Sequence, residues 1–151
     1  MKLYKRKILA RIQKLIGKEK GLVLQGARRV GKTAILQYLQ DGLNRQGKRT
    51  VYYDLAYPDV LANLSRGAPA LTADLTSKGY ANEEVYVLID DLQQLKQRDL
   101  FLGSILELNK NIHLIAASAV RVKPPPPLKV LEVSALSFSE FLEFKALESA
   151  Q

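Results

Sequence analysis

The sequence predicts an α/β fold with a mainly parallel sheet. Short, uninterrupted apolar runs alternate along the chain with segments whose apolar residues recur at helical spacing. Strands buried on both faces have such uninterrupted runs, and their alternation with helices is typical of parallel sheets. The length of 151 residues suits one domain. The mean hydropathy of -0.10 is typical of a globular chain.

Each apolar run is expected to form one strand. The predicted strands cover residues 22–24, 49–55, 85–89, 112–117 and 129–133. Helices are expected at residues 33–44 and, in one or two pieces, at residues 58–80. A further helix is expected after Asp99, which would be its N-terminal cap. The proline run at residues 124–127 cannot continue a helix or a central strand, so it is expected to be an extended spacer.

Residues 1–20 are expected to form a basic amphipathic helix, because apolar residues recur at helical spacing among lysines and arginines. Residues 1–50 carry fourteen basic and two acidic side chains, a net charge of +12. Residues 51–151 carry nine basic and thirteen acidic side chains, a net charge of -4. This asymmetry predicts an acidic partner, which could be nucleotide, nucleic acid or protein. A solvated basic face remains the alternative.

The composition excludes several classes of site. The chain has no cysteine and a single histidine, His113, which excludes disulfides, cysteine nucleophiles and His-rich zinc sites. No apolar run approaches the roughly 18–20 residues of a membrane helix. The sequence therefore predicts no membrane insertion and a cytoplasmic location.

The segment GARRVGKT at residues 26–33 matches the phosphate-binding Walker A pattern GxxxxGK[ST]. Its glycines allow backbone N–H groups to converge on phosphates at the start of the following helix. Lys32 is expected to reach the β- and γ-phosphates, and Thr33 to ligate Mg²⁺. The sequence thus predicts ATP with Mg²⁺ as the ligand. The residues expected to bind it are Gly26, Ala27, Arg28, Arg29, Val30, Gly31, Lys32, Thr33 and Ala34.

Two acids follow the apolar run at residues 85–89. Ligands of open α/β sheets sit at the carboxyl edge of the strands, so Asp90 is expected to hold Mg²⁺. Asp91 occupies the position where many ATPases of the additional-strand class have a glutamate that polarises the attacking water. It is expected to do the same, with a side chain one methylene shorter. The alternative is a solvated strand–helix turn, in which aspartates are common.

Further segments follow a recognisable order. YYDL at residues 52–55, LIDDLQ at residues 88–93 and LSFSEFL at residues 136–142 accompany the Walker A motif. With these segments the sequence resembles the AAA+-related ATP-binding proteins of bacteria and archaea. The resemblance implies a P-loop NTPase three-layer sandwich with about five strands in the order 5-1-4-3-2. It places the domain at residues 21–145 and leaves residues 146–151 as a tail.

The resemblance also implies a sensor role for Ser118, close to the γ-phosphate. Lys32, Asp91 and Ser118 are therefore the expected catalytic residues. The chain departs from the family in having Asp91 for glutamate, Ala116 for a common threonine, and no Gly-Arg pair before the last strand. These departures affect hydrolysis rather than binding, so slow ATP turnover is expected.

Two other functions remain open. One is a nucleotide-dependent binding module that contacts nucleic acid or a protein partner, including a second copy of the chain. The other is a small-molecule kinase. Tyr52 and Tyr53 are expected to fill the second strand rather than to stack on a base, and Asp54 to face the site.

Overall fold

The computed structural model describes residues 12–16, 20–27, 31–126, 128–134, 139, 142–143 and 145–148. Residues 12–16 are helical, and the rest of the predicted N-terminal helix lies outside the described residues. The segment at residues 136–142 also falls largely outside them. No helix in the described ranges is long and apolar enough to cross a bilayer.

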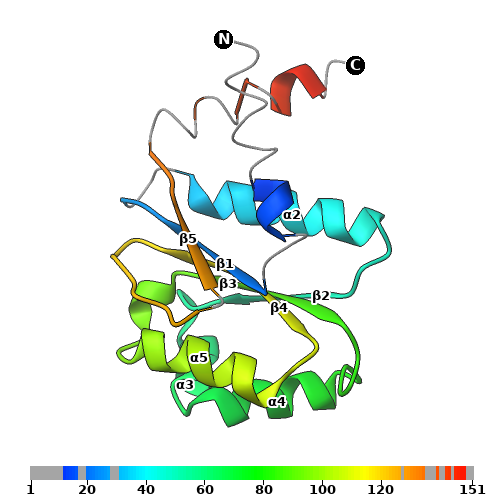
Figure 1. The fold of residues 1–151 in the computed structure, drawn as a ribbon, viewed down its shortest axis with the longest axis vertical. Coiled ribbons are helices and arrows are strands. Elements are labelled where there is room, and N and C mark those ends of the chain that lie inside the picture. Colours follow the sequence, from blue (N-terminus) through cyan, green and yellow to red (C-terminus); the bar gives the residue numbers. More distant parts are fainter. Residues whose placement is uncertain are drawn as a thin grey trace.

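A five-stranded sheet forms the centre of the fold, in the order β2-β3-β4-β1-β5 (Figure 1). All neighbouring strands pair in parallel. This arrangement confirms the predicted fold class and strand order. The strands are β1 (Gly21–Gln25), β2 (Thr50–Asp54), β3 (Val85–Asp90), β4 (Ile112–Ser118) and β5 (Leu128–Glu132).

The burial of each strand follows its sequence. β1 and β3 are buried along their whole length, as their uninterrupted apolar runs require, whereas β2 alternates between buried and half-buried residues. Gly21 begins β1 where a Cβ would lie 2.0 Å from Cδ2 of Leu128 in β5. A side chain at Gly21 would therefore require the Leu128 side chain to move.

Helices cover both faces of the sheet and complete a three-layer sandwich (Figure 1). On one face lie α2 (Lys32–Arg45) and residues 12–16, whose apolar residues share a core with β1, β3 and β4. On the other face lie α3 (Pro58–Leu64), α4 (Ala68–Ser77) and α5 (Arg98–Leu108), packed on a second core. A short 3₁₀ helix, η1 (Leu92–Gln94), follows β3.

The start of α5 differs from the prediction. Gln97 is the N-cap residue, and no side chain caps the helix, so the expectation that Asp99 caps it was wrong. Asp99 instead lies in the first turn, where its Oδ1 accepts a hydrogen bond of 3.1 Å from the backbone N–H of Lys123. Asp99 thus binds the loop after β4, which a local capping pattern does not reveal.

The proline spacer packs on the same helix. A Cβ at Gly103 of α5 would lie 3.1 Å from Cγ of Pro125. Among the described residues of the run, none lies in a helix or a strand, as predicted. The spacer therefore passes close to the backbone of α5 before β5 begins.

Candidate functional site

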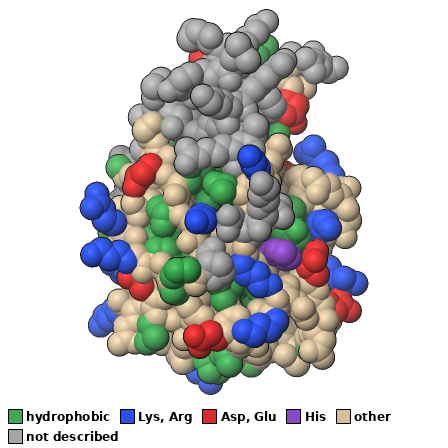
Figure 2. Space-filling view, viewed as in Figure 1, with side chains coloured by type: hydrophobic (Ala, Val, Ile, Leu, Met, Phe, Trp, Pro, Cys, Tyr) green, Lys and Arg blue, Asp and Glu red, His purple; other side chains and the backbone are tan. Residues whose placement is uncertain are grey.

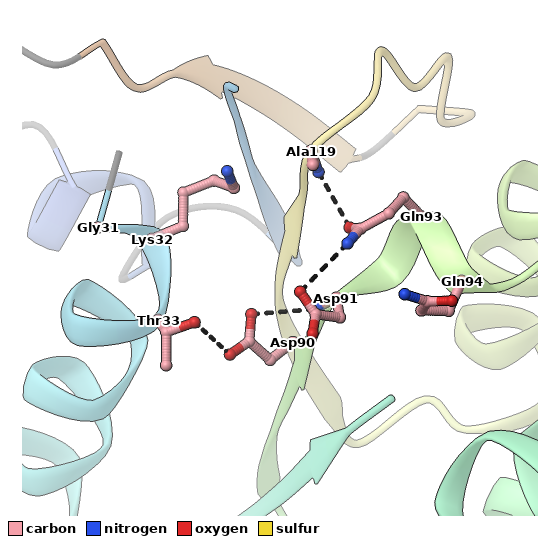
Figure 3. Close-up of a pocket in the computed structure, with 8 residues that line it drawn as sticks. All are labelled: Gly31, Lys32, Thr33, Asp90, Asp91, Gln93, Gln94 and Ala119. Atoms are coloured by element: carbon pink, nitrogen blue, oxygen red, sulfur yellow. Dashed lines mark hydrogen bonds between the residues drawn. The ribbon is translucent and has the colours of Figure 1, made fainter. Parts of the chain in front are cut away.

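A cleft of about 420 Å³ opens at the carboxyl edge of the sheet, between the start of α2 and the ends of β3 and β4 (Figure 3). In a parallel sheet all carboxyl ends meet at this edge, so distant segments converge here. The cleft is lined by Gly31, Lys32, Thr33, Asp90, Asp91, Gln93, Gln94 and Ala119.

The first turn of α2 lies at the cleft, and the first backbone N–H groups of a helix have no partner within it. Gly31 immediately precedes the helix with φ 89° and ψ 20°, a left-handed conformation that favours glycine. The first turn itself contains no acidic residue. This end of α2 is suited to an anion.

Lys32 lies across the base of the loop. Its Nζ donates hydrogen bonds to the backbone oxygens of Gly26 at 2.6 Å and Ala27 at 2.7 Å. Burial lowers the pKa of the Lys32 ammonium from its ordinary value, and the charges of Asp90 and Asp91 oppose that shift. Two of the ammonium hydrogens are engaged, which leaves a further donor for a ligand.

Asp90 ends β3 and is almost fully buried, with 3% of its surface exposed. Its Oδ2 accepts a hydrogen bond of 2.7 Å from the Thr33 hydroxyl, and its Oδ1 accepts one of 2.9 Å from the N–H of Asp91 (Figure 3). A buried carboxylate needs such partners to offset its desolvation. The structure therefore brings a hydroxyl and a carboxylate oxygen together in the cleft that Lys32 also lines.

A third donor reaches Asp90 from β2. The hydroxyl of Tyr52 donates to Oδ2 of Asp90 at 3.0 Å. Burial, followed by the charge of Asp90, raises the pKa of the Tyr52 phenol above its ordinary value, so the phenol remains a proton donor. Sequence reasoning assigned Tyr52 to strand filling and missed this contact.

Asp91 is held by Gln93. The Gln93 Nε2 donates to Oδ1 of Asp91 at 3.1 Å, and the Gln93 Oε1 accepts from the backbone N–H of Ala119 at 3.0 Å (Figure 3). Asp91 itself adopts φ 57° and ψ 45°, a left-handed conformation uncommon outside glycine. Gln93 thus links the acid after β3 to the end of β4.

The predicted residues divide into three groups. Those that line the cleft or contact Lys32 are Gly26, Ala27, Gly31, Lys32, Thr33, Asp90 and Asp91. Ala34 packs against the core under α2, and Ser118 is fully buried, with its hydroxyl donating to the Val120 oxygen at 2.7 Å. Arg28, Arg29 and Val30 lie outside the described residues, so their roles stay predictions.

Three residues that line the cleft were not expected from the sequence: Gln93, Gln94 and Ala119. Gln93 and Gln94 follow the two acids directly, and Ala119 follows the predicted sensor position. Their closeness along the chain to predicted residues was the one available signal. No pattern of residue types distinguishes these side chains from an ordinary turn.

The residues present fit a magnesium nucleotide. Mg²⁺ prefers hard oxygen ligands, and Thr33 with Asp90 supplies them at one edge of the cleft. Phosphates are suited to an ammonium beside a helix start, which Lys32 and α2 supply. The residues predicted for the metal and those predicted for the phosphates therefore line the same cleft.

The sequence model of a family described as an AAA domain matches residues 18–142. The chain belongs to this AAA domain family. None of the curated proteins matches the sequence significantly.

Solved structures share the fold of this AAA domain. A DnaA from Aquifex aeolicus, bound to AMPPCP, superposes with a TM-score of 0.52 and 16% identity over 95% of this chain and 51% of its own. A DNA replication initiation factor superposes with a TM-score of 0.51 and 16% identity, over 95% of this chain and 50% of its own. PCH-2 of C. elegans superposes with a TM-score of 0.50 and 17% identity, over 91% of this chain and 42% of its own. This AAA domain thus spans about half the length of these proteins, or less.

Proposed function

We propose that this AAA domain binds Mg-ATP in the cleft at the carboxyl edge of the sheet and hydrolyses it slowly. The observation that carries the proposal is the hydrogen bond of 2.7 Å from the Thr33 hydroxyl to Asp90, with Lys32 beside it in the same cleft. This pairing unites the two motifs that the sequence predicts for metal and phosphate. The AMPPCP in the similar DnaA structure is consistent with a nucleotide as the ligand.

In this proposal the protein groups bind rather than react. The N–H groups at the start of α2 and the ammonium of Lys32 hold phosphate oxygens, and Thr33 with Asp90 holds Mg²⁺. The bound metal would neutralise negative charge on the phosphates. Ala34 and the residues at positions 28–30 are proposed to complete the loop.

The described part of the cleft lining supports slow turnover. Lys32 is the one cation among the described lining residues, whereas fast phosphoryl transfer needs further positive charge on the transition state. Asp91 is the proposed base, yet one of its oxygens already accepts from Gln93. Ser118 remains a proposed sensor, one residue before Ala119 at the cleft.

The proposal is tested by titrating ATP into the chain in the presence of Mg²⁺. Lys32→Ala should weaken ATP binding severely, because Lys32 is the one cation among the described lining residues. Lys129→Ala, which removes an exposed lysine of β5, is the matched control and should bind as the wild type does. Equal affinity of Lys32→Ala and wild type would contradict the proposal.

A second function is a binding module in which ATP favours one conformation that a partner recognises. The Gln93 bridge between Asp91 and Ala119 supports it, because it connects the proposed phosphate end of the cleft to β4 and its following loop. The partner would be nucleic acid, another protein or a second copy of the chain. Phosphate release measured with and without DNA separates the two functions, since a module would bind ATP with no turnover in either condition.

A further inference from the structure

We propose that Tyr52 is a positioning residue for the metal site: its hydroxyl holds the carboxylate of Asp90 in the orientation that would receive Mg²⁺. This inference rests on the proposed function and extends it to β2, which carries neither nucleotide motif. Tyr52 is half-buried and does not line the cleft, so it acts through Asp90 rather than on the nucleotide.

The position of Tyr52 follows from the register of the sheet. In β2, Tyr52 pairs with Leu88 and Asp54 pairs with Asp90 of the neighbouring β3. Successive side chains of a strand point to opposite faces, so Tyr52 and Tyr53 diverge. Tyr52 packs on the face covered by α2, which has Thr33 in its first turn, and Tyr53 packs on the face covered by α4.

The two tyrosines use their hydroxyls differently. Tyr52 donates to Oδ2 of Asp90 at 3.0 Å, whereas Tyr53 donates to Oδ2 of Asp74 in α4 at 2.5 Å. Asp74 lies outside the cleft and also accepts from Lys78 at 2.8 Å. One strand therefore offers two hydroxyls, one on a half-buried ring at the proposed metal site and one on a buried ring away from it.

A carboxylate needs its partners to fix its orientation. The terminal torsion of aspartate is broad, so the plane of the Asp90 carboxylate is set by what it binds. At Oδ2 the donors are Thr33, itself a proposed metal ligand, and Tyr52. Of these two donors, Tyr52 is the one that is not itself a proposed metal ligand. Groups that orient metal ligands in this way tune the affinity of the site for the metal.

The experiment compares Tyr52→Phe with Tyr53→Phe in the full chain. Both substitutions remove one hydroxyl and keep the ring. The readouts are the Mg²⁺ concentration that gives half-maximal ATP binding, the ATP affinity in EDTA, and the melting temperature without ligand. Tyr52→Phe should raise the required Mg²⁺ concentration by about 10-fold, the lower end of the effect of removing a group that supports a metal ligand. Its ATP affinity in EDTA should not change.

Tyr53→Phe should lower the melting temperature through the lost bond to Asp74 and leave the Mg²⁺ requirement within about 2-fold of wild type, far below the loss expected for a supporting group. Tyr52→Met removes the same hydroxyl through a different side chain, so a folding defect of one substitution does not decide the result. The inference is overturned if both Tyr52 variants keep the wild-type Mg²⁺ requirement, need less Mg²⁺, or lose ATP affinity equally in EDTA. If the wild type itself shows no Mg²⁺-dependent ATP binding, the proposed function fails instead.

Discussion

The hydroxyl of Thr33 donates a hydrogen bond to Oδ2 of Asp90 at 2.7 Å, across 57 positions of sequence (Figure 3). This contact joins the first turn of α2 to the carboxyl end of β3. Without a metal, the hydroxyl hydrogen offsets part of the charge of a buried carboxylate. With a metal, the same two oxygens are suited to share it. We therefore expect the pair to set the metal dependence of the proposed site.

Replacement of Thr33 tests this pair directly. Thr33→Val keeps the shape of the side chain but removes the hydroxyl, so the Mg²⁺ requirement of ATP binding should rise by at least about 10-fold. Thr33→Ser keeps the hydroxyl and should bind close to wild type. The measurement is an ATP titration at several Mg²⁺ concentrations. Equal Mg²⁺ requirements in the two variants would remove Thr33 from the metal site.

Lengthening the side chain of Asp91 should accelerate hydrolysis. Aspartate places its carboxylate about 1.5 Å short of the position that glutamate reaches, and misplacement of that order costs roughly 100-fold in rate. Asp91→Glu should therefore raise the rate of phosphate release by about 10- to 100-fold without changing ATP affinity. Asp91→Asn, which keeps the shape and loses the base, should abolish the residual rate.

The conformation of Asp91 affects how this rate is measured. Its left-handed backbone favours aspartate over glutamate, so Asp91→Glu should be slightly less stable, and the assay belongs well below its melting temperature. A fast wild-type enzyme that Asp91→Glu slows down would show that the site requires aspartate. That result would refute the proposed reason for slow turnover.

Asp74 should contribute to acid sensitivity. Burial alone would raise its pKa, but hydrogen bonds from Lys78 and Tyr53 outweigh this effect and hold the pKa of Asp74 below its ordinary value. Because the folded pKa is the lower one, the stabilisation is fully present above the unfolded pKa of about 3.9. It is lost as the pH falls through the folded value.

Urea unfolding between pH 7 and pH 2 checks this dependence. Asp74→Asn should flatten the acid part of the stability profile, whereas Asp59→Asn, in the exposed first turn of α3, should leave it unchanged. Parallel profiles for Asp74→Asn and wild type would show that the pKa of Asp74 is the same in the folded and unfolded states.

The charge of residues 1–50 predicts electrostatic contact with a polyanion. On the face seen in Figure 2, Lys and Arg side chains are interspersed with Asp and Glu. Among the described residues, Arg49 pairs with Glu83, and Lys48 pairs with Glu84. The N-terminal positions 5–7 lie outside the described residues, and their basic side chains are proposed to contact the polyanion.

DNA binding measured between about 50 and 200 mM salt tests this contact, because each neutralised phosphate releases counterions and steepens the salt dependence. Neutralising Lys5, Arg6 and Lys7 together should flatten the slope. An unchanged slope would place the contact elsewhere, and the absence of any DNA binding at the lower salt would remove the contact altogether.

The sequence predicted those parts of the molecule that depend on local chemistry. The apolar run of β3 can only be buried, and the Walker A pattern fixes a strand, a loop and a helix in succession. Strand order came from resemblance, since the alternation of strands and helices does not specify which strands are neighbours. The Gln93 bridge depends on Ala119 at the end of β4, far away in the sequence.

Tyr52 shows where local reasoning stops. Alternation along β2 predicts that Tyr52 and Tyr53 face opposite sides, but only the pairing with β3 decides which ring approaches Asp90. The prediction that Asp99 caps a helix was wrong for a related reason. The partner of Asp99 is the backbone of Lys123, in a loop that the local capping pattern does not include.

The position of the metal tests the central claim most directly. A crystal of the chain with Mn²⁺ in place of Mg²⁺ and a non-hydrolysable ATP analogue gives an anomalous scattering peak at the metal. The account predicts this peak beside Thr33 Oγ1 and the Asp90 carboxylate, with the analogue's phosphates at Lys32. A peak away from both side chains, or a nucleotide bound outside the cleft, would contradict it.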